Sequence, residues 1–170
     1  MKILVTGGAG YKGVKLVSKL LDKGFKVSVL DNFMYGFEPF LHLVENDNLK
    51  VIKQDIRNKI DNLNKYDTIF HLAGLSGLPA CAANPSSAQL INVEATKQLA
   101  SSLGKNQRLI YASTTSFYIK WDSSMPDDMM RKCLDVSRLK EMGYRPRISL
   151  SEGVLRTIEE YRERKRTGTI

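Results

Sequence analysis

The stretch Lys2-Ile-Leu-Val-Thr-Gly-Gly-Ala-Gly-Tyr-Lys-Gly13 decides the fold of this 170-residue chain. Its apolar residues, 3–5, are typical of a buried β-strand, and the glycines that follow predict a tight turn. Beyond the turn, apolar residues recur at helical spacing: Val14, Leu16, Val17, Leu20 and Leu21. Strand, glycine-rich turn and helix form the context in which glycine spacing predicts a dinucleotide-binding loop.

The glycines of this turn fit two overlapping forms of that pattern. Gly8, Gly10 and Gly13 match G-x-G-x-x-G, whereas Gly7, Gly10 and Gly13 match T-G-x-x-G-x-x-G. Because glycine has no Cβ, the turn can be tight and a pyrophosphate can approach the backbone. The phosphates would then bind unpaired N–H groups at the positive end of the helix.

An acidic residue follows at the distance that this pattern requires. Residues 26–30 predict a second strand, and Asp31 stands at its carboxyl end. A carboxylate there accepts hydrogen bonds from a ribose 2′-hydroxyl and repels a 2′-phosphate, which favours NAD over NADP. The simpler alternative is that Asp31 only caps a loop and that the glycines only form a turn.

The following residues alternate between predicted strands and helices. Three further apolar segments predict strands, at residues 49–53, 68–73 and 108–112. A long helix is predicted from about residue 86 to 103, with Ser86 or Ser87 as its N-cap and Gly104 beyond its end. This alternation predicts an α/β fold, a doubly wound parallel sheet of about five strands that binds its ligand at their carboxyl ends.

Small and polar residues follow the later strands, at the edge where the ligand is expected. Asp55 is placed to accept a hydrogen bond from an adenine amino group, with Ile56 near the ring. Ala73 and Gly74 are small enough to let a cofactor pass close to the backbone. Asn92 falls inside the predicted long helix, where an amide is mildly unfavourable. It either faces solvent or is a buried amide that ties the helix to a strand.

The composition is that of an ordinary globular protein with an excess of positive charge. The chain is 42% hydrophobic and 26% charged, and its formal net charge is +8. The basic residues lack aromatic interleaving, so we interpret them as a solvated surface that attracts anionic ligands, not as a nucleic-acid site. No apolar run approaches the roughly 20 residues of a membrane span, and the chain enters a strand without a signal peptide. We therefore expect a cytoplasmic protein.

The cysteines and histidines predict no metal site. Cys81 and Cys133 lack metal-ligand spacing, which favours free thiols in a reducing compartment. His42 and His71 are scattered, and His71 is expected in the core or at a strand end.

Six ordered segments of residues 1–118 together form a recognisable set: Thr6-Gly-Gly-Ala-Gly-Tyr-Lys-Gly13, Asp31-Asn32, Asp55-Ile56, His71-Leu-Ala-Gly74, Asn92-Val93 and Tyr111-Ala-Ser-Thr-Thr-Ser-Phe-Tyr118. The set resembles the extended short-chain dehydrogenase/reductase family, and within it the NAD-dependent nucleotide-sugar epimerases and dehydratases. This resemblance implies a Rossmann domain over residues 1–118 with NAD as its cofactor. The cofactor-binding residues that it implies are Gly7, Gly10, Tyr11, Gly13, Asp31, Asn32, Asp55, Ile56, Leu72, Ala73 and Gly74.

The same resemblance implies a catalytic role and one departure. Thr114, at the Ser/Thr position of the family, would hydrogen-bond a sugar hydroxyl or keto oxygen of a nucleotide-sugar. Lys12 replaces the apolar residue that is usual between the last two glycines, and it either extends toward phosphate or points to water.

The C-terminal part resembles a different branch of the same superfamily. The matching segments are Trp121-Asp122, Met125-Pro-Asp127, residues 131–139, Gly143-Tyr144 and residues 148–153. They resemble the C-terminal end of GDP-L-fucose synthases, so residues 119–170 are interpreted as a shortened, helical remnant of a substrate domain. Residues 135–142 predict a short helix ended by Gly143, and Ser149 with Glu152 predicts a capping box for a last helix. Its apolar stripe is Val154, Leu155, Ile158 and Tyr161.

The catalytic pair that the resemblance implies is missing between these two parts. Family members carry Tyr-x-x-x-Lys on a helix after the Ser/Thr strand, and a spacing of four puts the proton-exchanging Tyr and the Lys on one face. Here Tyr118 runs almost directly into Trp121. The spacing recurs elsewhere, in Tyr11 with Lys15 at the phosphate turn and in Tyr161 with Lys165 on the last helix. Only Tyr161 and Lys165 are considered as substitutes.

Two functions therefore stay open. The first is an enzyme that uses NAD for hydride transfer at a sugar carbon of a nucleotide-sugar. The second is a catalytically inert, internally truncated NAD-binding or interaction module, and the internal gap is either natural or an artefact. Without a sixth strand, residues 108–112 are expected to form a sheet edge, which either the C-terminal tail or another subunit covers. The resemblance implies that the usual dimer uses the helix predicted at residues 86–103 and a second helix that is missing here, so a homodimer would have an altered interface.

Overall fold

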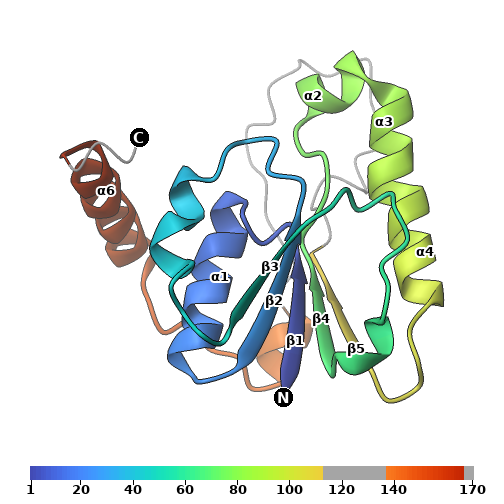
Figure 1. Cartoon of the computed structure of the whole chain (residues 1–170). Coiled ribbons are helices and arrows are strands. Elements are labelled where there is room, and N and C mark those ends of the chain that lie inside the picture. The colour runs from blue at the N-terminus through green and yellow to red at the C-terminus, as the bar shows by residue number, and fades with distance from the viewer. Residues whose placement is uncertain (113–136, 167–170) are drawn as a thin grey trace. The chain divides into compact units, whose positions relative to one another are not determined.

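A computed structural model of the chain describes residues 1–112 and 137–166 (Figure 1). The chain forms two compact units, Met1–Ala112 and Ser113–Ile170. The predicted domain boundary at residue 118 lies outside the described residues.

The N-terminal unit is built on a parallel five-stranded sheet with the strand order β3-β2-β1-β4-β5, which confirms the predicted fold class. The strands are β1 (Lys2–Thr6), β2 (Lys26–Asp31), β3 (Leu49–Lys53), β4 (Thr68–His71) and β5 (Arg108–Tyr111). Thr6 is in register with Leu30 of β2 and with His71 of β4, so the strand ends meet at one edge. The order reverses between β1 and β4, and crevices of α/β sheets that bind ligands open at such a reversal.

Helical segments connect the strands. They are α1 (Tyr11–Asp22), the 3₁₀ helices η1 (Glu38–Leu43) and η2 (Leu63–Lys65), α2 (Leu78–Ala83), α3 (Pro85–Gln89), the π-helical turn η3 (Leu90–Glu94) and α4 (Ala95–Ser101). Figure 1 shows α1 on one side of the sheet and α3 and α4 on the other.

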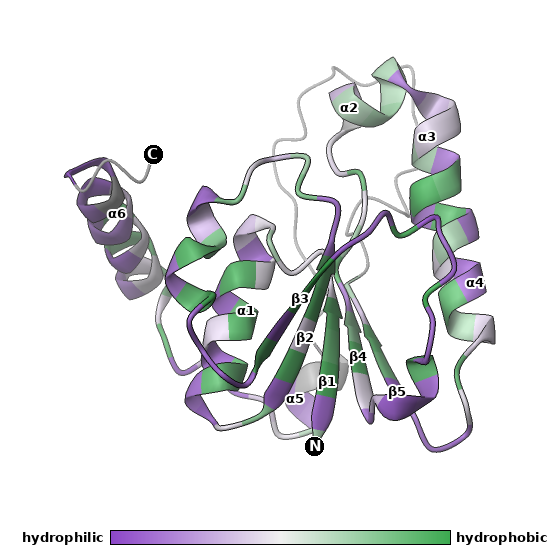
Figure 2. Ribbon diagram, in the orientation of Figure 1, coloured by the Kyte–Doolittle hydropathy of each residue, from purple (hydrophilic) through white to green (hydrophobic). Residues whose placement is uncertain are grey.

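Alternation along β1 divides the core into two layers. Ile3 and Val5 are fully buried against α1, whereas Leu4 is buried with Ala95 and Leu99 of α4. Figure 2 shows hydrophobic residues in the central strands and a mixture of hydrophilic and hydrophobic residues along α1 and α4. Successive strand residues point to opposite faces, so one apolar run supplies both layers.

The long helix predicted for residues 86–103 differs from the structure at its start and in its middle. Pro85 is its first residue, and the N-cap is Asn84, not Ser86 or Ser87, because the Asn84 side chain accepts a hydrogen bond of 3.0 Å from the Ser87 N–H. Its middle is π-helical rather than α-helical. The short helix that precedes it, α2, was not predicted from the sequence.

The C-terminal unit contains two described helices, α5 (Ser137–Glu141) and α6 (Leu150–Arg166). Gly143, after α5, adopts a φ of +82°, the left-handed conformation common beyond a helix end. At the start of α6 the Glu152 N–H donates to Ser149 Oγ at 3.2 Å, which confirms half of the capping box. The Glu152 carboxylate instead pairs with Arg156. The side chains of the predicted apolar stripe of α6 are exposed.

None of the helices in residues 1–112 and 137–166 has the length and apolar composition that a bilayer-spanning segment requires. Within the same ranges, no group of three or more His, Cys, Asp or Glu side chains is placed to bind a metal ion.

Candidate dinucleotide site

The turn after β1 is closed by glycines that no other residue can replace without strain. Gly7 has a φ of +70°, and a Cβ there would lie 2.5 Å from the backbone nitrogen of Ala73. A Cβ on Gly13 would collide with the backbone of Gly7 and Gly8. These two glycines therefore allow the turn, the helix and the end of β4 to come together.

Gly10 has a different role from the two glycines that pack inside the turn. A Cβ there would meet only the Gly7 carbonyl oxygen, at 3.4 Å, so the turn itself leaves space in front of this residue. Gly10 is the N-cap of α1 and provides no side-chain cap, and the first N–H groups of a helix have no partner within it. The backbone here fits a pyrophosphate, which would bind these N–H groups at the positive end of α1.

Asp31 lies beside this turn, at the end of β2. Its Oδ2 accepts a hydrogen bond of 3.0 Å from the Ala9 N–H, and its Oδ1 accepts one of 2.8 Å from the Phe33 N–H. Phe33 holds this position with a φ of +56°, which is rare for a bulky residue. Asp31 therefore does cap a loop, yet a carboxylate has about four acceptor positions, so both oxygens retain capacity for a ribose hydroxyl.

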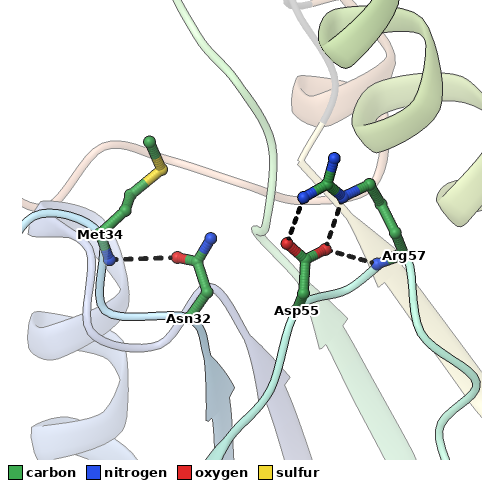
Figure 3. Close-up of polar contacts among 4 residues, drawn as sticks. All are labelled: Asn32, Met34, Asp55 and Arg57. Carbon is green, nitrogen blue, oxygen red and sulfur yellow. Dashed lines mark hydrogen bonds and ion pairs between the residues drawn. The ribbon is translucent and has the colours of Figure 1, made fainter.

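Asn32 and Asp55 follow neighbouring strands, β2 and β3 (Figure 3). The Asn32 Oδ1 accepts a hydrogen bond of 3.2 Å from the Met34 N–H. Asp55 is held by Arg57, whose Nε lies 2.9 Å from Oδ1 and whose Nη2 lies 2.7 Å from Oδ2. These hydrogen bonds are the main reason why the pKa of Asp55 is lowered, against the opposing effect of burial, so its carboxyl group is ionised at neutral pH.

The opposite wall is formed by the segment after β4. Leu72, Ala73 and Gly74 line it, and Asn92 of η3 holds the next residue, Leu75, by hydrogen bonds to both its N–H and its carbonyl oxygen. Asn92 is part-buried, so its amide ties the helix to its surroundings as in the second alternative, but it is not fully buried and its anchor is the segment beyond β4, not a strand.

One cleft joins these walls, and most of the predicted cofactor-binding residues line it. They are Gly7, Gly10, Asp31, Asn32, Asp55, Ile56, Leu72, Ala73 and Gly74. Two predicted residues do not line it. Gly13 is buried behind the turn, and the Tyr11 side chain is 63% exposed with the Lys15 ammonium 5.7 Å from its ring centre. Lys12 is also exposed, outside the cleft lining.

One wall of the cleft was not predicted from the sequence. Phe33, Met34, Tyr35 and Gly36 line it after β2, together with Gln54 after β3 and Ile91 on η3. The aromatic residues after Asp31 were the available signal, since apolar side chains are common in small-molecule sites. Local spacing alone did not indicate that this loop folds back over the strand ends.

Behind the cleft, His71 is fully buried at the end of β4, which confirms the expected core position. Its Nδ1 lies 2.6 Å from Thr6 Oγ1 and its Nε2 lies 2.9 Å from Thr96 Oγ1, so it links β1 to α4. Burial lowers its pKa, which keeps the ring neutral. A neutral imidazole can donate to one hydroxyl and accept from the other.

None of the predicted catalytic residues belongs to the described part of the N-terminal unit. Thr114 and Tyr118 lie outside the described residues, and so does Cys133. Tyr161 and Lys165 are exposed residues of α6 in the C-terminal unit. Cys81 is a free thiol, and its Sγ lies 3.5 Å from the Leu75 carbonyl oxygen.

Comparison with known proteins identifies relatives of this chain. A sequence model of the NAD dependent epimerase/dehydratase family matches residues 3–134. The bifunctional UDP-glucose 4-epimerase and UDP-xylose 4-epimerase 1 of Pisum sativum is 34% identical over 131 residues, which cover 69% of this chain and 37% of the relative. CDP-paratose 2-epimerase of Salmonella typhi is 36% identical over 128 residues, or 69% of this chain and 38% of the relative.

Solved structures show the same similarity. UDP-N-acetylglucosamine 4-epimerase from Methanobrevibacter ruminantium M1, in complex with UDP-N-acetylmuramic acid, has a TM-score of 0.62 at 29% identity and covers 78% of this chain and 44% of its own. A variant of UDP-glucuronic acid 4-epimerase from Bacillus cereus, in complex with UDP-4-deoxy-4-fluoro-glucuronic acid and NAD, has a TM-score of 0.63 at 27% identity. The match covers 75% of this chain and 45% of that protein. The chain thus spans less than half the length of these relatives.

Proposed function

The chain belongs to the NAD-dependent epimerase/dehydratase family, and from this premise we propose that its N-terminal unit binds NAD in the cleft at the carboxyl edge of the sheet. The observation that carries the proposal is the convergence of the Gly7–Gly10 turn, Asp31 and Ala73 on that cleft. The open backbone at Gly10 would hold the pyrophosphate, Asp31 the adenosine ribose, and Asp55 the adenine amino group.

We further propose that the function of the chain is hydride transfer at a sugar carbon of a nucleotide-sugar. Bound NAD would supply the hydride acceptor, and Thr114 would hydrogen-bond the reacting hydroxyl or keto oxygen. The relatives named above act on UDP- and CDP-linked sugars, which supports a nucleotide-sugar as the substrate class. The resemblance of residues 119–170 to GDP-L-fucose synthases adds GDP-linked sugars to the candidates.

A second candidate function is an NAD-binding or interaction module without turnover. It is favoured by the sequence, because no Tyr-x-x-x-Lys pair follows Thr114 before the chain reaches its C-terminal segment. Loss of a positioned acid/base costs about 10²- to 10⁴-fold in rate. The Tyr161–Lys165 pair of α6 has the required spacing and is the only substitute proposed.

One assay separates the two candidates. The protein with saturating NAD is incubated with UDP-, CDP-, dTDP- and GDP-linked sugars, and reduced nicotinamide and new sugar isomers are followed by absorbance and NMR. Enzyme function predicts turnover of at least one sugar, and loss of that turnover in Thr114→Ala. NAD binding without turnover of any sugar rejects the enzyme and supports the module.

We also propose that a second copy of the chain covers the outer edge of β5. Among the described strands β5 is an edge of the sheet, with backbone groups available for pairing on its outer side. Light scattering during gel filtration should then show a homodimer. A monomer whose β5 amides exchange rapidly with solvent would reject this proposal.

A further inference from the structure

Arg57 follows the cleft-lining residues Gln54, Asp55 and Ile56, and the fold does not explain its role. It lies four residues beyond β3, and its side chain is 44% exposed, so it fills no core. Its guanidinium is nevertheless fixed by two hydrogen bonds to Asp55, and its backbone N–H adds a third, 2.9 Å from Asp55 Oδ1. Exposed arginines usually retain rotational freedom, so this arrangement calls for a reason.

We propose that Arg57 is a positioning residue that fixes the Asp55 carboxylate so that the site distinguishes adenine from bases that lack its amino group. This inference rests on the proposed binding of NAD, and it concerns the reading of the base. Arg57 does not itself contact the base in this proposal. It acts through Asp55.

Arg57 leaves one acceptor position of Asp55 unfilled. A carboxylate has about four acceptor positions, and Arg57 occupies two on Oδ1 and one on Oδ2. The Asn32 side chain also hydrogen-bonds to this carboxylate, so an adenine amino group would take the remaining position in place of the Asn32 amide. A planar fork of two parallel hydrogen bonds sets the plane of the carboxylate, so it also sets the direction of that remaining position.

The backbone of this segment is held independently of the Arg57 guanidinium. The Gln54 side chain donates to the Lys59 carbonyl oxygen at 3.0 Å, and the Asn58 N–H donates to the Asp55 carbonyl oxygen at 3.1 Å. Ile56, next to Asp55, is buried in the core. Truncation of Arg57 should therefore free the Asp55 side chain without displacing its backbone.

Asn32, which follows β2, lies on the other side of the remaining acceptor position of Asp55. The Oδ1 of Asn32 already accepts from Met34, which sets the orientation of its amide (Figure 3). Asp31 and Lys53 are register partners at the ends of β2 and β3, so Asn32 and Asp55 border the same part of the cleft. A base that enters there meets an acceptor whose direction is fixed.

The test compares two dinucleotides, NAD and nicotinamide hypoxanthine dinucleotide, in which a carbonyl oxygen replaces the adenine amino group. Dissociation constants are measured by calorimetry for the wild type, Arg57→Ala, Arg57→Lys and Lys59→Ala. The adenine amino group can donate a hydrogen bond to the Asp55 carboxylate, whereas the carbonyl oxygen of hypoxanthine has no proton to donate. The wild type should therefore bind NAD about 10-fold or more tightly than the analogue.

Each variant has a distinct expected result. Arg57→Ala should weaken NAD binding by about 5-fold and leave binding of the hypoxanthine analogue almost unchanged, so that a preference of about 10-fold falls to about 2-fold. Arg57→Lys keeps the charge without the fork and should recover less than about half of the lost preference. Lys59→Ala removes an exposed positive charge nearby and should keep the wild-type preference, because a general loss of charge weakens both ligands equally.

The outcomes that overturn the inference differ from those that overturn NAD binding. If Arg57→Ala keeps the wild-type preference, Arg57 does not position Asp55 for the base, and NAD binding stands. If the wild type binds both dinucleotides equally, no adenine amino group is read at Asp55. If the wild type binds neither, NAD binding fails, and the role of Arg57 fails with it.

Discussion

The side-chain amide of Asn92 pairs with the backbone of Leu75 at both ends. Its Oδ1 accepts from the Leu75 N–H and its Nδ2 donates to the Leu75 carbonyl oxygen, each at 2.8 Å. This contact joins the π-helical turn to the cleft wall across 17 residues of sequence. A Cβ on neighbouring Gly74 would approach Asn92 Oδ1 to 3.2 Å, so the wall passes close to the amide.

Removal of this amide should loosen the cleft wall. In Asn92→Ala, the Leu75 N–H loses its partner and the Leu75 carbonyl oxygen keeps only its weak contact with the Cys81 thiol, which should lower the free energy of unfolding by about 1–3 kcal/mol. Urea denaturation measures the change. The matched control is Gln89→Ala, which removes an exposed contact to Glu94 in the same helical segment and should cost less than about 0.5 kcal/mol. Equal stability of the two variants would contradict the role of Asn92.

Alanine substitutions at two glycines of the turn should affect different properties, protein stability at Gly7 and ligand binding at Gly10. In Gly7→Ala the new methyl group meets the Ala73 backbone at a φ of +70°, so this variant should unfold at a clearly lower urea concentration.

In Gly10→Ala the methyl group has space within the fold, so the free energy of unfolding should change by less than about 1 kcal/mol. It occupies the proposed pyrophosphate position, so NAD affinity should fall by about 10-fold or more. Wild-type NAD affinity in a folded Gly10→Ala protein would place the phosphates elsewhere.

His71 should make stability depend on pH. Its pKa in the folded protein is lowered by burial, so below about pH 6.5 the unfolded chain binds a proton that the native ring does not accept. The stabilisation is therefore complete above about pH 6.5 and declines as the pH falls toward the native pKa, by at most about 1.4 kcal/mol per pH unit.

The measurement is the unfolding free energy of the wild type and of His71→Asn as the pH is lowered from about 6.5 toward the native pKa of His71. The contributions of other titrating groups are the same in both proteins, so they cancel in the difference. The difference should shrink as the pH falls. A constant difference would mean that His71 does not take up a proton on unfolding.

Tyr66 contains a polar group that burial leaves unsatisfied. The residue is 3% exposed, and within the described residues its hydroxyl has no hydrogen-bond partner. Tyr66→Phe removes the desolvated hydroxyl and keeps the ring, so the unfolding free energy should rise by up to about 1 kcal/mol. Tyr66→Ala should instead cost about 3–5 kcal/mol, because it leaves a cavity. A Tyr66→Phe protein less stable than wild type by more than about 1 kcal/mol would show that the hydroxyl has a partner.

The strand ends were predictable because a polar residue follows each apolar run in the sequence. Apolar runs end at Thr6, Asp31 and Asp55, and parallel strands bring such ends to one edge, so the sequence indicated both the sheet and the position of the cleft. The glycine spacing was similarly informative, since Gly7 and Gly13 pack where only glycine fits.

Features that depend on distant contacts were not predictable in the same way. The pairing of Asp55 with Arg57 needs a side-chain rotamer, and the contact of Asn92 with Leu75 needs the crossing of two segments. The N-cap was assigned to serines because they directly follow Pro85, although proline at the first helical position makes the preceding Asn84 the cap. Propensity does not indicate a π-helical turn, and the positive φ of Phe33 reflects the hydrogen bond of its N–H to Asp31.

Calorimetric titration of NAD into the wild type and into Asp31→Ala tests the central claim, that this family member binds NAD between the glycine turn and the end of β2. One NAD should bind per chain, and Asp31→Ala should bind it about 10-fold or more weakly, because the ribose loses a charged acceptor. Absence of heat with the folded wild type, or equal affinity in the two proteins, would contradict the claim.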